Sequence, residues 1–287
     1  VVNGIVRDLS GIKSVTVNGE EATLDGINWS YNLKLVANTT TTVTVVATNN
    51  EGKTSTMTRY VHYDNMAPTL TVNAPTSTNS STPTYTTSAS YVVNGTASDT
   101  SGIKSVTVNG QPATFSGNNW SYNLALGANT TTTVTVVATD NVGRTTTQTR
   151  YLFYDSAAPN LNVTAPSTTL TSAWPNYTVT GTTTDASGVT SVVVNGAAAS
   201  LSGTSFSRAI TLSSGVNTVT VTSTDRAGRT TTITRTIYYW NVNSESDMAT
   251  FAGNSTYINS GLANNDFRYI LWQSQVACSK LASSSTA

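Results

Sequence analysis

The sequence predicts an all-β protein made of tandem antiparallel β-sandwich domains, and three observations support this fold class. Similar stretches recur along the chain, apolar and polar residues alternate within them, and Gly and Asn stand between the alternating runs. Strict alternation is typical of half-buried strands, whose successive side chains point to opposite faces. Roughly one in five of the 287 residues is threonine, a β-branched residue that tolerates a pleated surface. We therefore expect threonine to form the polar faces of the strands.

Internal repeats divide the chain into domains. The segment SGIKSVTVNG at residues 10–19 recurs identically at 101–110, and a diverged copy, DASGVTSVVVNG, lies at 185–196. A spacing of about 90 residues is too long for a solenoid unit and suits one small domain per repeat. We expect domains at residues 1–65, 66–156 and 157–240, followed by a distinct C-terminal segment at 241–287.

The second repeat shows the expected strands in order. Apolar and polar residues alternate at 106–108, again at 120–126, and again at 134–138. Asn109-Gly110, directly after the first of these runs, predicts a hairpin. About seven short strands per repeat, with no helical segment, predict a β-sandwich of immunoglobulin-like (Ig-like) type. The single cysteine excludes a disulfide within the chain, so the valines and one aromatic side chain per repeat must form the core.

The first repeat lacks one predicted strand. Residues 67–75 and 158–166 share the pattern AP-x-L-x-V-x-AP, which predicts the first strand of the second and third repeats. The first repeat begins at a point that aligns with the second strand, so its first strand is missing. Either the sequence is trimmed upstream, or an open sheet edge at Val2 and Ile5 accepts a strand from a neighbouring subunit.

The C-terminal segment contains a candidate for such a donated strand. Residues 266–278, DFRYILWQSQVAC, are densely apolar, and an exposed apolar segment rarely persists without a partner. A short helix and the start of a truncated further domain are the alternatives. We expect self-association with neighbouring subunits through these contact residues: Phe267, Tyr269, Ile270, Leu271 and Trp272.

Aspartates recur at the predicted turns and at the domain junctions. Calcium binds six to eight oxygens, several of them from carboxylates, so these residues are candidate ligands. Turn chemistry accounts equally well for Asp before Ser-Gly, because its side chain bonds to the nearby backbone. Asn49 stands in the first repeat where the others have Asp. We expect no bound metal or cofactor, with calcium as the alternative at Asp64, Asp99, Asp140, Asp155, Asp185 and Asp225.

Charge and histidine content argue against several classes of function. The 14 basic and 14 acidic residues cancel, whereas binding to nucleic acid or an anionic membrane rests on many Lys or Arg side chains. The longest apolar run is too short for a transmembrane helix. His62 is the only histidine, and we expect it to face solvent on a closing strand. The sequence shows no convergent pair of acids and no phosphate-binding loop, so we expect a non-enzymatic protein.

A series of motifs resembles a known family. SG(I/V)xSVxVNG is followed by an aromatic residue before xLxLxxxxN, then by TVTVxATDxxGR and a closing TRxxxYD. The series is similar to bacterial Ig-like domains of cell-surface adhesins and to the accessory domain of glucodextranase, over roughly residues 1–240. The third repeat departs from it at Thr190, Phe206 and Trp240, where the other repeats have Lys, Trp and Asp.

The resemblance implies an extracellular role without catalytic residues. We expect a structural surface or filament subunit, linked to its neighbours by donor-strand or edge-strand contacts. An accessory fragment of a secreted glycoside hydrolase, serving as spacer or carbohydrate-binding module, is the alternative, and the stalk of an adhesin is another. A surface glycan is a candidate partner, whereas nucleic acid and membrane insertion are not expected.

Overall fold

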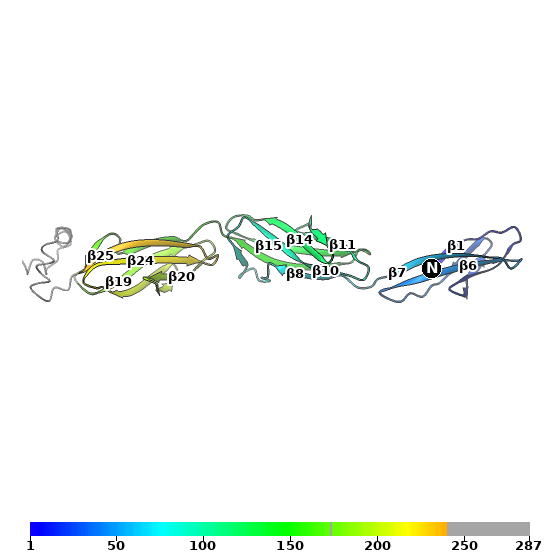
Figure 1. Cartoon of the computed structure of the whole chain (residues 1–287), viewed down its shortest axis with the longest axis horizontal. Coiled ribbons are helices and arrows are strands. Elements are labelled where there is room, and N and C mark those ends of the chain that lie inside the picture. Colours follow the sequence, from blue (N-terminus) through cyan, green and yellow to red (C-terminus); the bar gives the residue numbers. More distant parts are fainter. Residues whose placement is uncertain (173, 240–287) are drawn as a thin grey trace, which may run out of the picture. The chain divides into compact units, whose positions relative to one another are not determined.

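The structure is a computed structural model that describes residues 1–172 and 174–239. Figure 1 shows β-strands throughout this part of the chain. The sheets fall into three sets, one for each repeat, which we call domain 1 (β1 to β7), domain 2 (β8 to β16) and domain 3 (β17 to β25). The chain is thus all-β and built of tandem Ig-like domains, as the sequence predicts. The described residues include no helix with the length and apolarity needed to cross a membrane.

Domain 1 has one sheet of order β1-β5-β4 and a second of order β3-β2-β6-β7. The strand bounds are β1 (Val2–Ile5), β2 (Ile12–Val17), β3 (Glu20–Glu21), β4 (Thr23–Asp25), β5 (Asn28–Tyr31), β6 (Thr39–Asn49) and β7 (Thr54–Tyr63). Within the described residues β1 pairs on one side only, with β5.

Domain 2 has sheets of order β13-β14-β10-β8 and β12-β11-β15-β16-β9. The strand bounds are β8 (Thr69–Ala74), β9 (Thr84–Thr86), β10 (Ser90–Ser98), β11 (Ile103–Val108), β12 (Gln111–Pro112), β13 (Thr114–Ser116), β14 (Asn119–Ala125), β15 (Thr130–Asp140) and β16 (Thr145–Tyr154). The predicted first strand is confirmed here as β8, which pairs with β10.

Domain 3 repeats this arrangement, with sheets of order β17-β19-β23-β22 and β18-β25-β24-β20-β21. The strand bounds are β17 (Asn160–Ala165), β18 (Leu170–Ser172), β19 (Asn176–Thr184), β20 (Val189–Val194), β21 (Ala197–Ala198), β22 (Ser200–Ser202), β23 (Ser205–Thr211), β24 (Gly215–Asp225) and β25 (Thr230–Tyr239).

One short strand departs from the antiparallel arrangement that the sequence predicts. In domain 3, β18 pairs in parallel with β25, so that Leu170 lies opposite Ile237. In domain 2, β9 takes the matching place beside β16. Pro75 and Pro166, which directly follow β8 and β17, have no N–H to extend the ladder. The first strand therefore ends there, and the chain crosses to the second sheet.

The central strands confirm the predicted alternation. In β15, Val134, Val136 and Ala138 are fully buried, and the residues between them are half-buried. The predicted hairpin is confirmed as well, because Asn109 and Gly110 have φ angles of 50° and 80°. Two successive positive φ angles match the twist of the flanking strands in a two-residue turn.

A glycine faces an aromatic ring across the first sheet of each complete domain. Gly95 lies opposite Trp120 in domain 2, and Gly181 lies opposite Phe206 in domain 3. A Cβ on Gly95 would lie 1.9 Å from the Thr71 carbonyl oxygen and 2.7 Å from Cζ2 of Trp120. The ring fills the space that a side chain would need, and Trp120 is only 2% exposed. The predicted aromatic residue at the core is confirmed in both domains.

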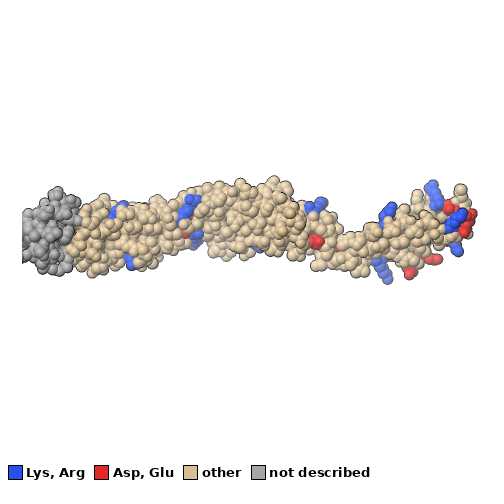
Figure 2. Space-filling model, viewed as in Figure 1, with Lys and Arg blue, Asp and Glu red and all other residues tan. Residues whose placement is uncertain are grey.

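Charged side chains are sparse on the surface. On the face that Figure 2 shows, they lie among uncharged residues and form no broad basic patch over the described part of the chain. The ion pair between Lys53 and Glu51, at 2.9 Å, joins two exposed side chains within one turn.

Candidate functional site

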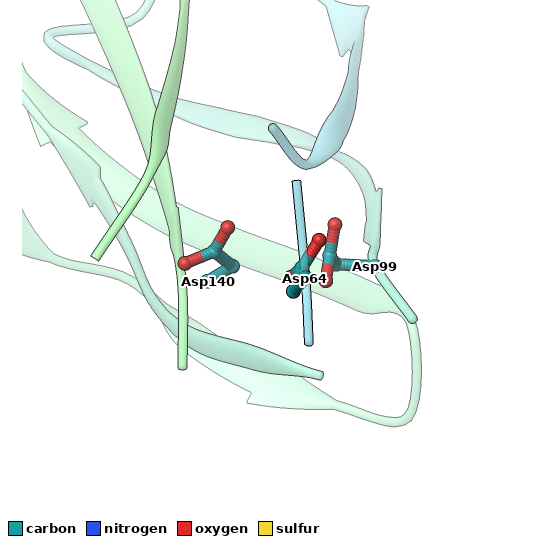
Figure 3. Close-up of side chains that lie close together, drawn as sticks. All are labelled: Asp64, Asp99 and Asp140. Carbon is teal, nitrogen blue, oxygen red and sulfur yellow. The ribbon is translucent and has the colours of Figure 1, made fainter. Parts of the chain in front are cut away.

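The six aspartates that the sequence marks as calcium candidates converge into two groups of three. The first aspartate cluster is Asp64, Asp99 and Asp140, and the second aspartate cluster is Asp155, Asp185 and Asp225. Within each cluster, one carboxylate oxygen of every residue lies within 4.8 Å of those of the other two. Figure 3 shows the side chains of the first cluster gathered from three separate segments of the chain.

The first member of each cluster comes from the last hairpin of a domain. Asp140 ends β15, and its Oδ1 accepts hydrogen bonds from the backbone amides of Val142 (2.9 Å) and Arg144 (2.8 Å). In the second cluster, Oδ1 of Asp225 accepts a bond of 2.8 Å from the Arg229 amide. The turn chemistry that the sequence predicts therefore uses Oδ1 and leaves the second oxygen, Oδ2, for another partner.

The second member comes from the corner that follows β10 or β19. Oδ1 of Asp99 accepts two bonds of 2.7 Å, from the amide and from the hydroxyl of Ser101. Oδ1 of Asp185 accepts the same pair from Ser187, at 2.7 and 2.6 Å. These two carboxylates are half-buried, whereas the other members of both clusters are buried. Each cluster is therefore reached from solvent on its corner side.

The third member comes from the linker, by which we mean residues 64–68 before domain 2 and residues 155–159 before domain 3. Oδ1 of Asp64 accepts a bond of 3.0 Å from the Met66 amide, and Oδ1 of Asp155 accepts one of 3.1 Å from the Ala157 amide. In both linkers, the aspartate side chain thus accepts a hydrogen bond from the backbone amide two residues further along the chain. Their Oδ2 atoms take no part in these turns.

Arginine and threonine side chains of the last hairpin hold the linker backbone. Nη2 of Arg229 donates to the carbonyl oxygen of Asp155 at 3.0 Å, and Oγ1 of Thr231 donates to that of Pro159 at 2.6 Å. Domain 2 makes the matching contacts through Arg144 and Thr146 to Asp64 and Pro68. The hydrogen bonds of these arginines thus end on backbone carbonyls and not on the carboxylates.

Two carboxylate oxygens in each cluster are buried without a hydrogen-bond partner. They are the Oδ2 atoms of Asp64 and Asp140 in the first cluster and of Asp155 and Asp225 in the second. Asp140 and Asp155 are 0% exposed. A buried polar atom that is left unpaired loses its hydration without compensation. Within the described residues, no ion pair involves either cluster.

The pKa of Asp64 in the first cluster is lowered, whereas the pKa of Asp225 in the second cluster is raised. The Ser101 hydroxyl, followed by the Met66 amide, lowers the pKa of Asp64 below its usual range. Burial raises the pKa of Asp225, and the negative charges of Asp155 and Asp185 raise it further, against a lowering by the Arg229 amide. In the second cluster, the like charges thus oppose full ionisation.

Domain 1 offers an internal contrast at the same place. Asn49 occupies the hairpin position, and its Oδ1 accepts bonds from the amides of Glu51 (3.1 Å) and Lys53 (2.9 Å). Its Nδ2 donates to Oδ1 of Asp8 at 3.2 Å. Asn49 therefore has partners for both ends of its side-chain amide, whereas Asp140 and Asp225 have none for Oδ2.

The residues that the sequence predicts to contact a neighbouring subunit do not belong to the two aspartate clusters. Val2 is half-buried on β1, and Ile5 is 66% exposed at its end. The C-terminal contact residues Phe267, Tyr269, Ile270, Leu271 and Trp272, and residues 241–287 as a whole, lie outside the described residues.

The expectation that His62 faces solvent is wrong. His62 is half-buried, and its Nδ1 shares a hydrogen bond of 3.0 Å with Oγ1 of Thr40 on the neighbouring strand β6. The side chain therefore pairs across the sheet.

Sequence reasoning missed the residues that support the clusters. Ser101 and Ser187 orient the corner aspartates, and Arg144 and Arg229 hold the linkers. The signal that could have found them is their recurrence, because each pair stands at the same place in two repeats.

Comparisons with known proteins agree with the fold. Residues 159–240 match the family described as glucodextranase, domain B. Titin domains I67–I69 in an E-to-A mutated variant are 10% identical, with a TM-score of 0.50 over 83% of this chain and 91% of that one. Fibronectin(III)-like modules of Clostridium thermocellum CbhA are 13% identical, with a TM-score of 0.39 over 60% and 94% of the two chains. No curated protein matches the sequence.

Proposed function

We propose that the chain is a non-enzymatic structural protein of the cell exterior, whose Ig-like domains act as spacers within a surface or filament protein. The observation that carries this proposal is the repeated linker. Residues 64–68 and 155–159 are each held by one arginine, one threonine and one aspartate cluster. Polar side chains that an enzyme would present to a substrate are used here to fix the segments between domains.

The family match supports the placement outside the cell. Glucodextranase domain B and Ig-like or fibronectin-like modules are typical of extracellular proteins. The low content of charged residues, 10%, also leaves few Lys and Arg side chains for trypsin-like proteases.

The open side of β1 supports self-association by strand addition. Its counterparts pair on both sides: β10 lies between β8 and β14, and β19 lies between β17 and β23. Within the described residues no strand lies at the matching position beside β1, so the outer backbone groups of Val2–Ile5 can pair with an added strand, whether from residues that precede Val1 or from a neighbouring subunit. We propose that a strand from a second copy of the chain occupies this position in the assembly, in the place that β8 takes beside β10 in domain 2.

A peptide tests this edge directly. A synthetic peptide of residues 67–75, APTLTVNAP, should bind the chain and protect the β1 amides from hydrogen exchange, whereas a scrambled peptide should not. Analytical ultracentrifugation of the chain alone should show concentration-dependent association that the peptide suppresses. A chain that stays monomeric and ignores the peptide would rule out self-association at this edge.

The structural role has its own test. Antibodies raised against the chain should label intact cells of the source organism, and protease treatment of those cells should remove the labelling. A signal confined to the cell interior would contradict the proposal.

The family match favours one alternative, an accessory module of a secreted carbohydrate-active enzyme. Domain 3 carries the match to glucodextranase domain B, over residues 159–240. In that case the chain should be retarded on affinity gels that contain soluble α-glucans, relative to an inert protein of similar size. Equal migration with and without polysaccharide favours the spacer role.

A further inference from the structure

We propose that each aspartate cluster binds one hard divalent cation, with Ca²⁺ preferred, and that the cation fastens the linker to the domain that follows it. The inference goes beyond the structural role proposed above and does not depend on where the protein resides. It rests on the unpaired oxygens, the donor chemistry and the contrast with domain 1.

The unpaired oxygens are the first argument. In the first cluster, Oδ2 of Asp64 and Oδ2 of Asp140 are buried without a hydrogen-bond partner, although these residues are only 6% and 0% exposed. Asp155 and Asp225 repeat this in the second cluster, at 0% and 2%. A buried group without a partner points to something that the protein chain does not itself supply. The same unpaired oxygens recur at the corresponding place of the next repeat.

The donor set is the second argument. Backbone amides and serine hydroxyls bond to the Oδ1 atoms and orient the carboxylates, and one oxygen of each carboxylate lies within 4.8 Å of those of the other two. All three ligating side chains offer oxygen, and neither cluster includes a histidine or a cysteine. Oxygen donors suit Ca²⁺ and Mg²⁺, whereas zinc and copper favour nitrogen and sulfur. Water can complete the coordination from the half-buried side of Asp99 or Asp185.

The choice of Ca²⁺ follows from the geometry that each ion requires. Ca²⁺ accepts six to eight oxygens in flexible arrangements, and Mg²⁺ demands a near-ideal octahedron. Three carboxylates, each fixed by its own turn, do not adjust easily to an octahedron. Ca²⁺ tolerates them as they stand.

Charge is the third argument. Three carboxylates whose oxygens lie within 4.8 Å of one another repel, and within the described residues no ion pair neutralises them. Arg144 donates its hydrogen bond to the carbonyl oxygen of Asp64, and Arg229 donates to the carbonyl oxygens of Asp155 and Thr87. A divalent cation would balance the charge from within the cluster, because a bound ion is the largest local charge in such a site.

Domain 1 supplies the fourth argument. Its hairpin residue is Asn49, and the amide nitrogen takes the place of an ion by donating to Asp8. Domain 1 thus meets the need of this corner with a side-chain amide, where domains 2 and 3 leave a carboxylate oxygen unpaired.

The consequence of binding would be local. The cation would join three segments that are distant in sequence: the linker at Asp64, the corner at Asp99 and the hairpin at Asp140. Without it, residues 64–68 keep the hydrogen bonds from Arg144 and Thr146 to their backbone. Residues 155–159 keep the matching bonds from Arg229 and Thr231, and the bonds that Ser156 donates to Asn129.

Calcium binding to the full chain tests the proposal. Isothermal titration of chelator-treated protein at pH 7.5 should give two Ca²⁺ per chain, with dissociation constants of about 10⁻³ M or tighter. D140N and D225N should each bind one, and the double variant none. D25N, which changes an exposed aspartate of β4 outside the clusters, should still bind two.

The Asn variants are expected to fold, because Asn49 already accepts the two amide bonds of its hairpin in domain 1. Circular dichroism of each variant in chelator checks this. Proteinase K digestion adds a second readout: Ca²⁺ should slow cleavage in both linkers of the wild type, and D225N should lose only the protection of residues 155–159.

Three outcomes would overturn the proposal. The wild type could bind no Ca²⁺ at millimolar concentration, which would mean that the clusters share protons instead. The double variant could bind as much Ca²⁺ as the wild type. Finally, Mg²⁺ at an equal concentration could displace Ca²⁺, which would refute the preference for Ca²⁺.

Discussion

Nδ2 of Asn49 donates a hydrogen bond of 3.2 Å to Oδ1 of Asp8, at the place where domains 2 and 3 have two carboxylates and no such donor. In domain 1 the side-chain amide of Asn49 is hydrogen-bonded to Asp8, whereas the two aspartate clusters keep unpaired carboxylate oxygens. Domain 1 therefore serves as an internal comparison for the unpaired carboxylates of domains 2 and 3.

Replacing Asn49 with Asp should destabilise domain 1. N49D removes the donor to Asp8 and brings two carboxylates together, so the melting temperature of domain 1 should fall by roughly 5 °C. Hydrogen exchange of β6 peptides reports on this domain alone. N32D adds the same charge at an exposed position and should leave the exchange of β6 unchanged. Equal exchange in both variants would show that the Asn49 amide contributes nothing.

Replacing Gly95 with Ala should destabilise domain 2 by about 2 kcal/mol or more, because the new methyl group meets the Thr71 carbonyl at 1.9 Å. The matched variant is G4A, whose Cβ would meet only the Trp29 side chain, at 2.9 Å from Nε1. Urea unfolding should show a clearly smaller loss for G4A. Similar losses in the two variants would contradict the role of the backbone contact.

Replacing Thr231 with Val should loosen the linker before domain 3. T231V removes the 2.6 Å hydrogen bond to the Pro159 carbonyl and keeps the shape of the side chain, at a cost of about 1 kcal/mol. Residues 155–159 should be cleaved faster by proteinase K. T230V changes the exposed neighbour and should be cleaved at the wild-type rate. If proteinase K cleaves T231V and T230V at the same rate, the hydrogen bond from Thr231 to Pro159 does not stabilise the linker.

Asp8 gives domain 1 a defined response to acid. The Ser10 hydroxyl, at 2.5 Å, lowers the pKa of Asp8 below its ordinary value of 3.8, and the Ser10 amide and the Asn49 amide add to this. Because the folded pKa lies below the unfolded one, the stabilisation is complete above pH 3.8 and is lost as the pH falls through the folded pKa.

An NMR titration of the side-chain carboxyl carbon measures this pKa. S10A should move the pKa of Asp8 up toward 3.8, because the leading cause of the shift is gone. An unchanged pKa in S10A would mean that the hydroxyl does not set it.

Much of the fold could be predicted from local pattern. Val134, Val136 and Ala138 alternate with less buried residues, and Asn109-Gly110 supplies a turn that only a few residue types tolerate. The short strands β9 and β18 could not be predicted, because three residues show no period. Their pairing depends on where the chain crosses between sheets after Pro75 and Pro166.

The cluster residues could be predicted one by one, but their convergence could not. Each aspartate has a local reason to be where it is, since its Oδ1 bonds to a nearby amide. The local bond gives no sign of the proposed second role, cation binding. That role depends on how the linker, a corner and a hairpin meet in space. The departure at Asn49 is visible in the sequence, but its partner Asp8 lies 41 residues away and is brought to it only by the fold.

The most direct test of the cation clusters is a crystal structure of the chain grown with Ca²⁺. We expect a strong density peak, with anomalous signal, at about 2.3–2.6 Å from the Oδ2 atoms of each cluster. The first peak should lie between Asp64, Asp99 and Asp140, and the second between Asp155, Asp185 and Asp225. At millimolar Ca²⁺, the clusters could instead hold only water, or their carboxyl groups could bond directly to one another. Either result would contradict the proposed cation binding.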